Sequence, residues 1–239
     1  MKRIFVFTLL ISMTLSSCGQ KINFGKILDE VSKSTQGGLS QGEIAAGLKE
    51  ALQVGINLGA DKASLTDGYF KNPRIKIPFP EDVKKIETTL RNVGLGGEVD
   101  KFVLALNRGA EEAAKEAKPI FISAIRQMTI TDAINILKGE KDAATQFLKR
   151  TTSTQLAAAF EPSVVRALEK TQASRYYTDL ANVYNKVPFV TKVNPDLKGY
   201  ATQKAIDGLF LLVADEEAKI RENPLARTTE LLRRVFGSI

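Results

Sequence analysis

The feature that most constrains the fold is the apolar run GLFLLVA at 208–214, inside the longer segment 200–221. The apolar residues at helical spacing in this segment are Ile206, Phe210, Val213 and Ile220, and leucines occupy the remaining faces of the run. A helix that is apolar on every side is buried, and this run is too short to cross a bilayer, which takes about 20 apolar residues. We therefore expect 200–221 to be the central helix of an all-helical domain.

The chain begins MKRIFVFTLLISMTLSSCGQ, which has the pattern of a bacterial secretory signal. Lys2 and Arg3 precede an apolar stretch at 4–15, and LSSC at 15–18 resembles the lipobox of bacterial lipoproteins. The resemblance implies cleavage before Cys18 and lipidation of that residue. Cys18 is the only cysteine, so it has no disulfide partner within the chain. The alternative is an ordinary secretory signal followed by a free thiol.

Lipidation of Cys18 would attach two or three acyl chains, enough for stable membrane anchoring. Gly19 and Gln20 follow Cys18, with neither the Asp nor the acidic run that would, by resemblance to other lipoproteins, direct the protein elsewhere. We therefore expect a bacterial cell-envelope protein, lipid-anchored in the outer membrane and facing the periplasm. The expected organisation is a signal peptide at 1–17, a lipidated N-terminus and linker at 18–39, and one helical domain at 40–239.

Composition excludes several functions. Without its 17 signal residues the 239-residue chain would keep 222 residues, and its net charge of +7 would fall to about +5 because Lys2 and Arg3 are lost. The charges are well mixed along the chain, which argues against a nucleic-acid partner. No His is present, so zinc, copper and haem sites lose their usual ligands and the commonest general base is missing. We expect no cofactor.

Helical patterns cover most of the remaining chain. They predict about ten helical segments and no convincing strand, joined by short loops into a single bundle. Ser40 and Glu43 have the spacing of a capping box at the start of the first of these helices. Within that helix, Ala51 and Gly55 lie beside the apolar stripe and would let a neighbouring helix approach closely.

One long segment is predicted to be non-helical, LTDGYFKNPRIKIPFP at 65–80. Its three prolines forbid a regular helix, and apolar residues alternate with Arg74, Lys76 and Pro78 in its second half. We interpret it as an extended strap that lies over the bundle. Arg74 is a candidate ligand-binding residue, because a rigid basic strap could close over a cleft; the alternative is that the strap only packs.

Three long stretches carry a family resemblance. They are NPRIKIPFPE at 72–81, AKPIFISAIRQMTITDAINILKGEKDAATQFLKRTTSTQL at 117–156, and KAIDGLFLLVADEEAKIRENPLARTTELLRRVFG at 204–237. These blocks resemble a bacterial lipoprotein family catalogued as domain of unknown function 4197. The resemblance implies an envelope location and a helical fold, and it brings no known activity or catalytic residues.

A cluster of cations and hydroxyls is the first candidate binding site. We expect Asp142 to cap a helix, residues 151–154 to interrupt it, and Pro162 to start the next one. Cations beside hydroxyls at a helix start can hold a phosphate or carboxylate. The candidate residues are Arg150, Thr151 and Thr152, together with the second Arg-Thr-Thr triplet, of which Arg227 and Thr228 are candidates. The alternative is that these hydroxyls only cap helices.

Asp207 is the second candidate, because it places a charge at the start of the most apolar helix. Buried carboxylates are seldom left unpaired, so we expect a structural ion pair with Arg126, Arg108 or Arg150, or else a carboxylate that contacts a ligand. The acidic triplet at 215–217 is expected to be a solvated helix face.

Two classes of function remain. A binding protein would hold a lipid or another amphiphilic or anionic ligand between its helices, with the head group on Arg and Thr and the tail in the core. A structural or protein-interaction module in envelope assembly would act through its surface on other envelope proteins. An internal cavity would distinguish the two. An enzyme is the least favoured class, because no motif for a nucleophile and its base is visible.

Overall fold

The computed structural model describes residues 39–81, 84–170, 172–186, 188–189, 192–194, 196–227 and 229–237. Leu39–Ile239 form one compact unit, and its described residues contain helices but no strand. The all-α prediction is therefore confirmed. The predicted signal peptide and Cys18 lie outside the described residues.

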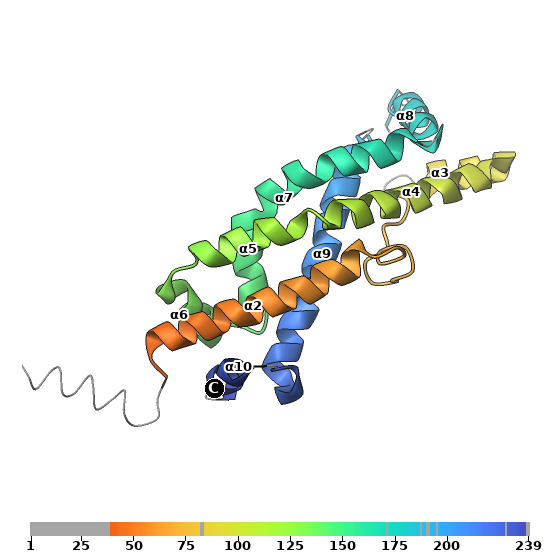
Figure 1. Cartoon of the computed structure of the whole chain (residues 1–239). Coiled ribbons are helices and arrows are strands. Elements are labelled where there is room, and N and C mark those ends of the chain that lie inside the picture. The colour runs from red at the N-terminus through yellow and green to blue at the C-terminus, as the bar shows by residue number, and fades with distance from the viewer. Residues whose placement is uncertain are drawn as a thin grey trace, which may run out of the picture. The chain divides into compact units, whose positions relative to one another are not determined.

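The helices follow one another with short connections. They are α2 (Gln41–Ser64), α3 (Lys84–Leu90), η2 (Arg91–Leu95), α4 (Gly96–Ala114), α5 (Ala117–Gln127), α6 (Ile130–Lys138), α7 (Ala143–Glu169), α8 (Gln172–Tyr184), α9 (Leu197–Glu222), η3 (Pro224–Ala226) and α10 (Glu230–Gly237). Figure 1 shows α4 and α7 side by side, with α9 crossing behind them and behind α2. The bundle is therefore built around α9, as the apolar run predicts.

The helix α9 is buried along most of its length. Side chains from Ile206 to Val213 are buried on nearly every face, with Asp207 the exposed exception. Asp196 begins the helix by accepting hydrogen bonds from the amides of Lys198 and Gly199. The prediction of a buried central helix at 200–221 is confirmed.

The helix α2 crosses α9 at glycines. A Cβ atom on Gly59 would lie 3.4 Å from the backbone nitrogen of Val213, and one on Gly55 would lie 3.5 Å from the Cβ of Glu216. The two backbones therefore come close because Gly55 and Gly59 have no side chain, as predicted for Gly55. The capping box at the start of α2 is also present, since Ser40 Oγ accepts from the Glu43 amide at 3.2 Å and Glu43 accepts from the Ser40 amide at 2.9 Å.

The predicted break at 151–154 is wrong. Helix α7 runs without interruption from Ala143 to Glu169 and contains Pro162. The hydroxyls of Thr151 and Thr152 donate to the carbonyls of Phe147 and Leu148, four residues earlier. Threonines whose hydroxyls bond in this way are compatible with the middle of a helix. The run of hydroxyl residues therefore lies within the helix and does not end it.

The segment 65–80 is the predicted strap. It is non-helical, and Ile75, Ile77 and Phe79 are buried against the bundle. Tyr69 anchors the first half of the strap, because its ring is fully buried and its hydroxyl donates to the Ala205 carbonyl of α9 at 2.6 Å. The strap therefore packs as part of the core.

The interior of the bundle is closely packed. An apolar void between α2, α9 and α10 has a volume of about 20 Å³. A space of that size holds about one water molecule, so this void has no room for an acyl chain. Three larger hollows of the described residues, with volumes of about 580, 380 and 270 Å³, lie at the surface.

Candidate functional site

The largest of these three hollows lies between α4 and α7, next to the end of α2, and we call it the α4–α7 cleft. Its volume is about 580 Å³, which is within the usual range for small-molecule sites. Its cations are Lys101, Arg108, Lys115, Arg166 and Lys170, its hydroxyls are Ser64, Thr66 and Ser163, and its carboxylates are Glu111 and Glu112. Cations therefore outnumber carboxylates among the described residues of its lining.

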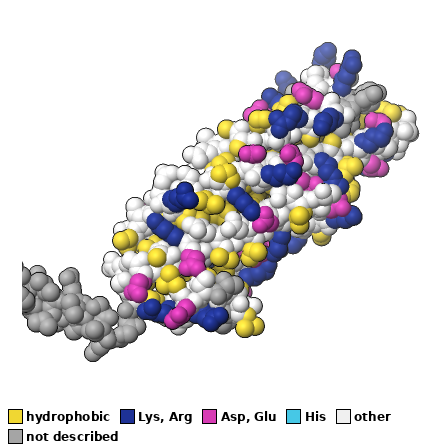
Figure 2. Space-filling model, in the orientation of Figure 1, with side chains coloured by type: hydrophobic (Ala, Val, Ile, Leu, Met, Phe, Trp, Pro, Cys, Tyr) yellow, Lys and Arg dark blue, Asp and Glu magenta, His cyan; other side chains and the backbone are white. Residues whose placement is uncertain are grey.

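The floor of the cleft exists because α4 and α7 cross at small residues. A Cβ atom on Gly109 would lie 2.9 Å from the Cβ of Ala167 and 3.3 Å from the Cα of Val164. Where two helices cross at small side chains, the longer side chains on either side of the crossing project outward. Here they form the two walls of the cleft. Figure 2 shows many Lys and Arg side chains over the part of the unit where α3, α4, α7 and α8 lie.

Regular spacing places the cations on the two walls. Lys101 and Arg108 of α4 and Lys115, which directly follows α4, come at seven-residue intervals, so they lie on one face. Arg166 is in the last turn of α7 and Lys170 directly follows the helix, four residues on, so the two lie on one face. Both spacings are visible in the sequence, but the pairing of α4 with α7, which joins the two sets, is not.

Three of the five cations are neutralised by carboxylates. Arg108 bonds Glu111 at 2.5 Å and Asp67 at 2.6 Å, and these two bonds raise the pKa of its guanidinium. Lys115 pairs with Glu112, and Lys101 pairs with Glu98 at 2.8 Å. These three cations therefore have fixed partners.

Arg166 and Lys170 differ from the other three. Both are exposed, and neither has a carboxylate within ion-pairing distance in the part of the chain that the structure describes. The guanidinium of Arg166 donates to the hydroxyl of Ser163 at 2.8 Å, which holds it against the cleft. The wall formed by α7 thus presents two cations with unused binding capacity.

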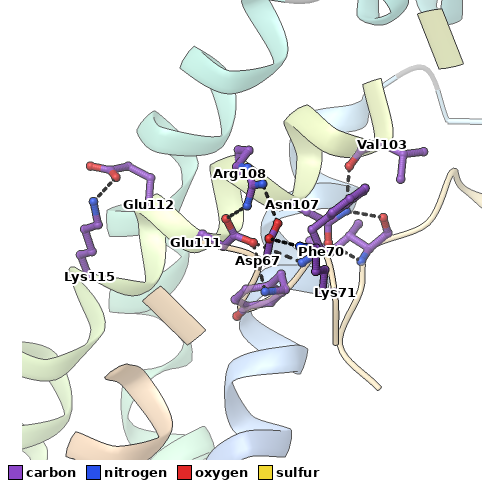
Figure 3. A network of polar contacts seen from close by, with 11 residues as sticks. Asp67, Phe70, Lys71, Val103, Asn107, Arg108, Glu111, Glu112 and Lys115 are labelled. Carbon is purple, nitrogen blue, oxygen red and sulfur yellow. Dashed lines mark hydrogen bonds and ion pairs between the residues drawn. The ribbon is translucent and has the colours of Figure 1, made fainter. Parts of the chain in front are cut away.

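The strap supports the opposite wall, as Figure 3 shows. Glu111 accepts from the backbone amides of Tyr69 at 3.1 Å and Phe70 at 3.2 Å, besides bonding Arg108. Asn107 bonds both backbone groups of Ile77, accepting from its amide and donating to its carbonyl, each at 2.8 Å. These bonds fix the strap to α4 and hold Arg108 in place.

The candidate cluster at 150–152 does not form the predicted site. Thr151 and Thr152 lie in the middle of α7, so no free helix start exists there, and Arg150 is exposed with its guanidinium 5.5 Å from the Phe147 ring. Arg227 instead donates to the carbonyls of Ile220 and Arg221 at 3.1 and 2.9 Å, at the end of α9.

The other half of that cluster is only partly described. Thr228 lies outside the described residues. Within the described part, no hydrogen bond or ion pair joins Arg227 to Arg150, Thr151 or Thr152. The two Arg-Thr-Thr triplets are therefore not seen to form one site.

The prediction of a buried ion pair at Asp207 is wrong. Its carboxylate is exposed and accepts from Gln203 Nε2 at 2.9 Å, one turn away on α9. Asp207 and Arg74 do line one shallow groove of about 270 Å³ between the strap and α9. Arg74 is paired there with Asp215 through two hydrogen bonds.

Arg126 is exposed near the end of α5, outside this groove and the α4–α7 cleft.

Besides Glu111 of the cleft, two further carboxylates are buried, Glu216 and Glu217, which the sequence pattern placed on a solvated face. They are only 5% and 7% exposed. Glu217 accepts from the amides of Ala144 and Thr145 at 3.0 and 2.8 Å and pairs with Arg221 at 2.9 Å. It therefore caps α7 from another helix.

Asp142 does not perform the role predicted for it. Its side chain makes no capping hydrogen bond at the start of α7. The amides that it would have capped are taken by Glu217, so the local signal is overridden by a tertiary contact.

Glu216 makes a testable contribution to stability at low pH. Burial raises the pKa of its carboxyl, but bonds from Lys219 at 2.8 Å and Lys62 at 2.5 Å outweigh burial, and the net pKa is lowered. A lowered folded-state pKa stabilises the fold above the unfolded value, about 4.3, and this stability is lost as the pH falls through the folded value.

We therefore expect Glu216→Gln to weaken the dependence of the unfolding free energy on pH below about pH 4.3. Urea denaturation at a series of pH values measures this dependence. Glu169→Gln, a matched change at an exposed position in α7, should leave the dependence as it is in the wild type. Equal pH dependence in the wild type and Glu216→Gln would contradict the assignment.

Comparison with known families covers the whole helical unit. Residues 38–237 match the family described as "Protein of unknown function (DUF4197)". The chain belongs to the DUF4197 family. The match includes α4, α7 and the strap, so the α4–α7 cleft is part of the DUF4197 domain itself. No curated protein and no solved structure matches the chain.

Two further features of the DUF4197 domain bear on its site. Among the described residues, no group of three or more His, Cys, Asp or Glu side chains is arranged to hold a metal ion. No single described helix is long and apolar enough to span a membrane, although α5 and α6 meet that test as a pair bent by 105°.

Proposed function

We propose that this protein is a non-catalytic binding protein of the bacterial envelope that holds an anionic ligand in the α4–α7 cleft. The observation that supports the proposal is the pair of cations, Arg166 and Lys170, that have no carboxylate partner among the described residues of a cleft of about 580 Å³. In a structure where the other cleft cations are paired, these two can bind a ligand without breaking an existing ion pair.

The chemistry of the cleft fits a phosphate or carboxylate group. A guanidinium presents a planar set of donors that matches either anion, and Ser163 fixes Arg166 in position. Glu111 and Asp67 hold Arg108 on the facing wall. The ligand would therefore meet groups that are already oriented, which reduces the entropy lost on binding.

The envelope location rests on the sequence. The signal pattern and the lipobox at Cys18 favour anchoring in the outer membrane, with the helical domain in the periplasm. The helix α2 is about 36 Å long, at 1.5 Å per residue, and its last residue, Ser64, lines the cleft. The cleft therefore lies at the opposite end of α2 from Leu39, where the described chain begins.

A protein-interaction module in envelope assembly is the competing function. The close packing of the interior, with a void of only about 20 Å³ in the core, suits such a module, because it leaves no place for a lipid tail there. Ligand binding at the cleft distinguishes the two functions.

We expect the compact unit 39–239 to bind pyrophosphate or citrate, as phosphate and carboxylate probes, in isothermal titration calorimetry. The double change Arg166→Gln with Lys170→Gln should weaken binding at least tenfold, because hydrogen bonds to charged groups contribute about 1.5–3 kcal/mol each. A double change at Lys149 and Arg150 to Gln is the matched control, since both are exposed cations of α7 outside the cleft.

Two results would overturn the proposal. One is the absence of binding of either probe by the wild-type protein. The other is an equal loss of affinity in the two double variants, which would show that the probes respond only to net charge.

A further inference from the structure

The direction of the two helices places the cleft cations in a definite order. Figure 1 shows α4 and α7 running antiparallel, and Gly109 faces Ser163, Val164 and Ala167 at their crossing. Arg166 therefore lies near the level of Arg108. Lys170, one turn further along α7, lies toward the level of Lys101. Four of the five cations thus form two groups along the cleft, and the fifth, Lys115, is paired with Glu112 at the end of α4.

Each group combines one neutralised and one available cation. Arg108 is paired with Glu111 and Asp67, whereas Arg166 across the cleft has only Ser163 as a described partner. At the other group, Lys101 is paired with Glu98, whereas Lys170 has no described carboxylate partner.

The spacing of the two groups of cations indicates the length of the ligand. Arg166 and Lys170 are separated by about 6 Å along the axis of α7, and Lys101 and Arg108 by about 10 Å along α4, at 1.5 Å per residue. A single phosphate or carboxylate would satisfy one group and leave the other unused. The cleft is therefore longer than one small anion needs.

The lining also limits the kind of ligand. Its described residues include no aromatic side chain, whereas sites for single-stranded nucleic acid stack bases on aromatic rings. The lining residues that lie between the two groups of cations are Leu104 and Ala105 of α4 and Ala167 of α7, which are small or aliphatic. This middle section of the cleft would accommodate a short uncharged part of the ligand that joins two anionic groups.

We propose that the ligand of the α4–α7 cleft carries two anionic groups, phosphates or carboxylates, about 6–10 Å apart, one bound by Arg166 with Arg108 and the other by Lys170 with Lys101. This inference rests on the proposed function, because it specifies the ligand class of the same site. The two anions belong either to a lipid head group or to a free soluble molecule.

A series of dicarboxylates of increasing length tests the inference. We expect calorimetry on the compact unit 39–239 to show that pimelate binds about tenfold more tightly than malonate, because only the longer molecule reaches both groups. Lys170→Gln should lower the affinity for pimelate about tenfold and change that for malonate less than about twofold. Lys149→Gln, outside the cleft on the same helix, should change neither.

The outcomes separate the two proposals. If malonate and pimelate bind equally well and both lose affinity on Arg166→Gln, the two-anion inference is overturned while the proposed function stands. If no member of the series binds, and pyrophosphate and citrate also fail, both are overturned. If Lys170→Gln weakens malonate and pimelate by the same factor, Lys170 does not bind a second anion.

Vesicles identify the source of the two anions. Cosedimentation with vesicles containing cardiolipin, whose head group has two phosphates, is compared with vesicles of equal charge containing phosphatidylglycerol. A preference for cardiolipin that Lys170→Gln removes supports a lipid head group. Tight binding of pimelate without such a preference supports a free soluble dianion.

Discussion

Replacing Glu217 with Ala is expected to lower the free energy of unfolding by roughly 3–5 kcal/mol, the usual effect of removing one partner from a buried ion pair. The change leaves the Arg221 side chain, which is only 13% exposed, without its carboxylate. It also leaves the amides of Ala144 and Thr145 without the acceptor that begins α7. Both losses occur at a junction where α6, α7 and α9 meet, because Arg221 also bonds the carbonyls at the end of α6.

Urea denaturation followed by circular dichroism measures the effect. Glu222→Ala is the matched control, because Glu222 is in the same helix but is exposed and lies 3.6 Å from its partner Lys141. Exposed pairs contribute about 0–1 kcal/mol, so this variant should unfold close to the wild type. Equal midpoints for Glu217→Ala and Glu222→Ala would show that Glu217 does not hold the junction.

Features determined by neighbouring residues could be predicted from the sequence. The capping box at Ser40 needs only a residue three positions away, and the burial of α9 follows from its own apolar faces. The strap was predictable because it has three prolines within eight residues, which no regular helix tolerates, whereas a single proline, Pro162, is accommodated inside α7. In each case the physical cause lies within one or two helical turns of the residue concerned.

The errors concern residues whose partners are distant in sequence. Glu217 caps amides more than 70 positions earlier in the chain, so an acidic residue that looks solvated is buried. Asp207 shows the converse, because the helix turns its carboxylate to the surface. Local patterns give the periodicity of a helix but not which of its polar residues meets another helix.

The α4–α7 cleft likewise depends on residues that are distant from one another in the sequence. The seven-residue spacing of Lys101, Arg108 and Lys115 predicts a cationic face on one helix, and the spacing of Arg166 and Lys170 predicts one on another. The cleft exists only because Gly109 allows these two helices to cross closely. That pairing is a property of the packed bundle and could not be read from either spacing alone.

Replacing Gly208 with Ala is expected to displace the strap and to lower the free energy of unfolding by about 1–3 kcal/mol, the usual cost of overpacking a core. A Cβ atom at this position would lie 2.8 Å from Cε1 of Tyr69 and 3.1 Å from Cβ of Ile75. Both neighbours are buried and belong to the strap. Because α9 is held on its other sides by α2 and α7, the strap is the element that must move.

Two measurements separate displacement of the strap from general destabilisation. Limited trypsin digestion should cut Gly208→Ala faster than the wild type after Lys71, Arg74 or Lys76, which lie in the strap. Gly97→Ala in α4 is the control, because its added Cβ meets no atom within 4 Å, and Ala in place of Gly in a helix is neutral or stabilising by up to about 1 kcal/mol.

The contact with Tyr69 can be isolated by a double-mutant cycle. Tyr69→Leu removes the Cε1 atom that the new methyl group would meet, so Gly208→Ala should cost less in that background than in the wild type. Neighbouring residues commonly show coupling of about 0.5–3 kcal/mol in such cycles. Additive effects would mean that the clash is with Ile75 alone. In that case the strap would shift only at its second half, and cleavage would increase after Arg74 and Lys76 but not after Lys71.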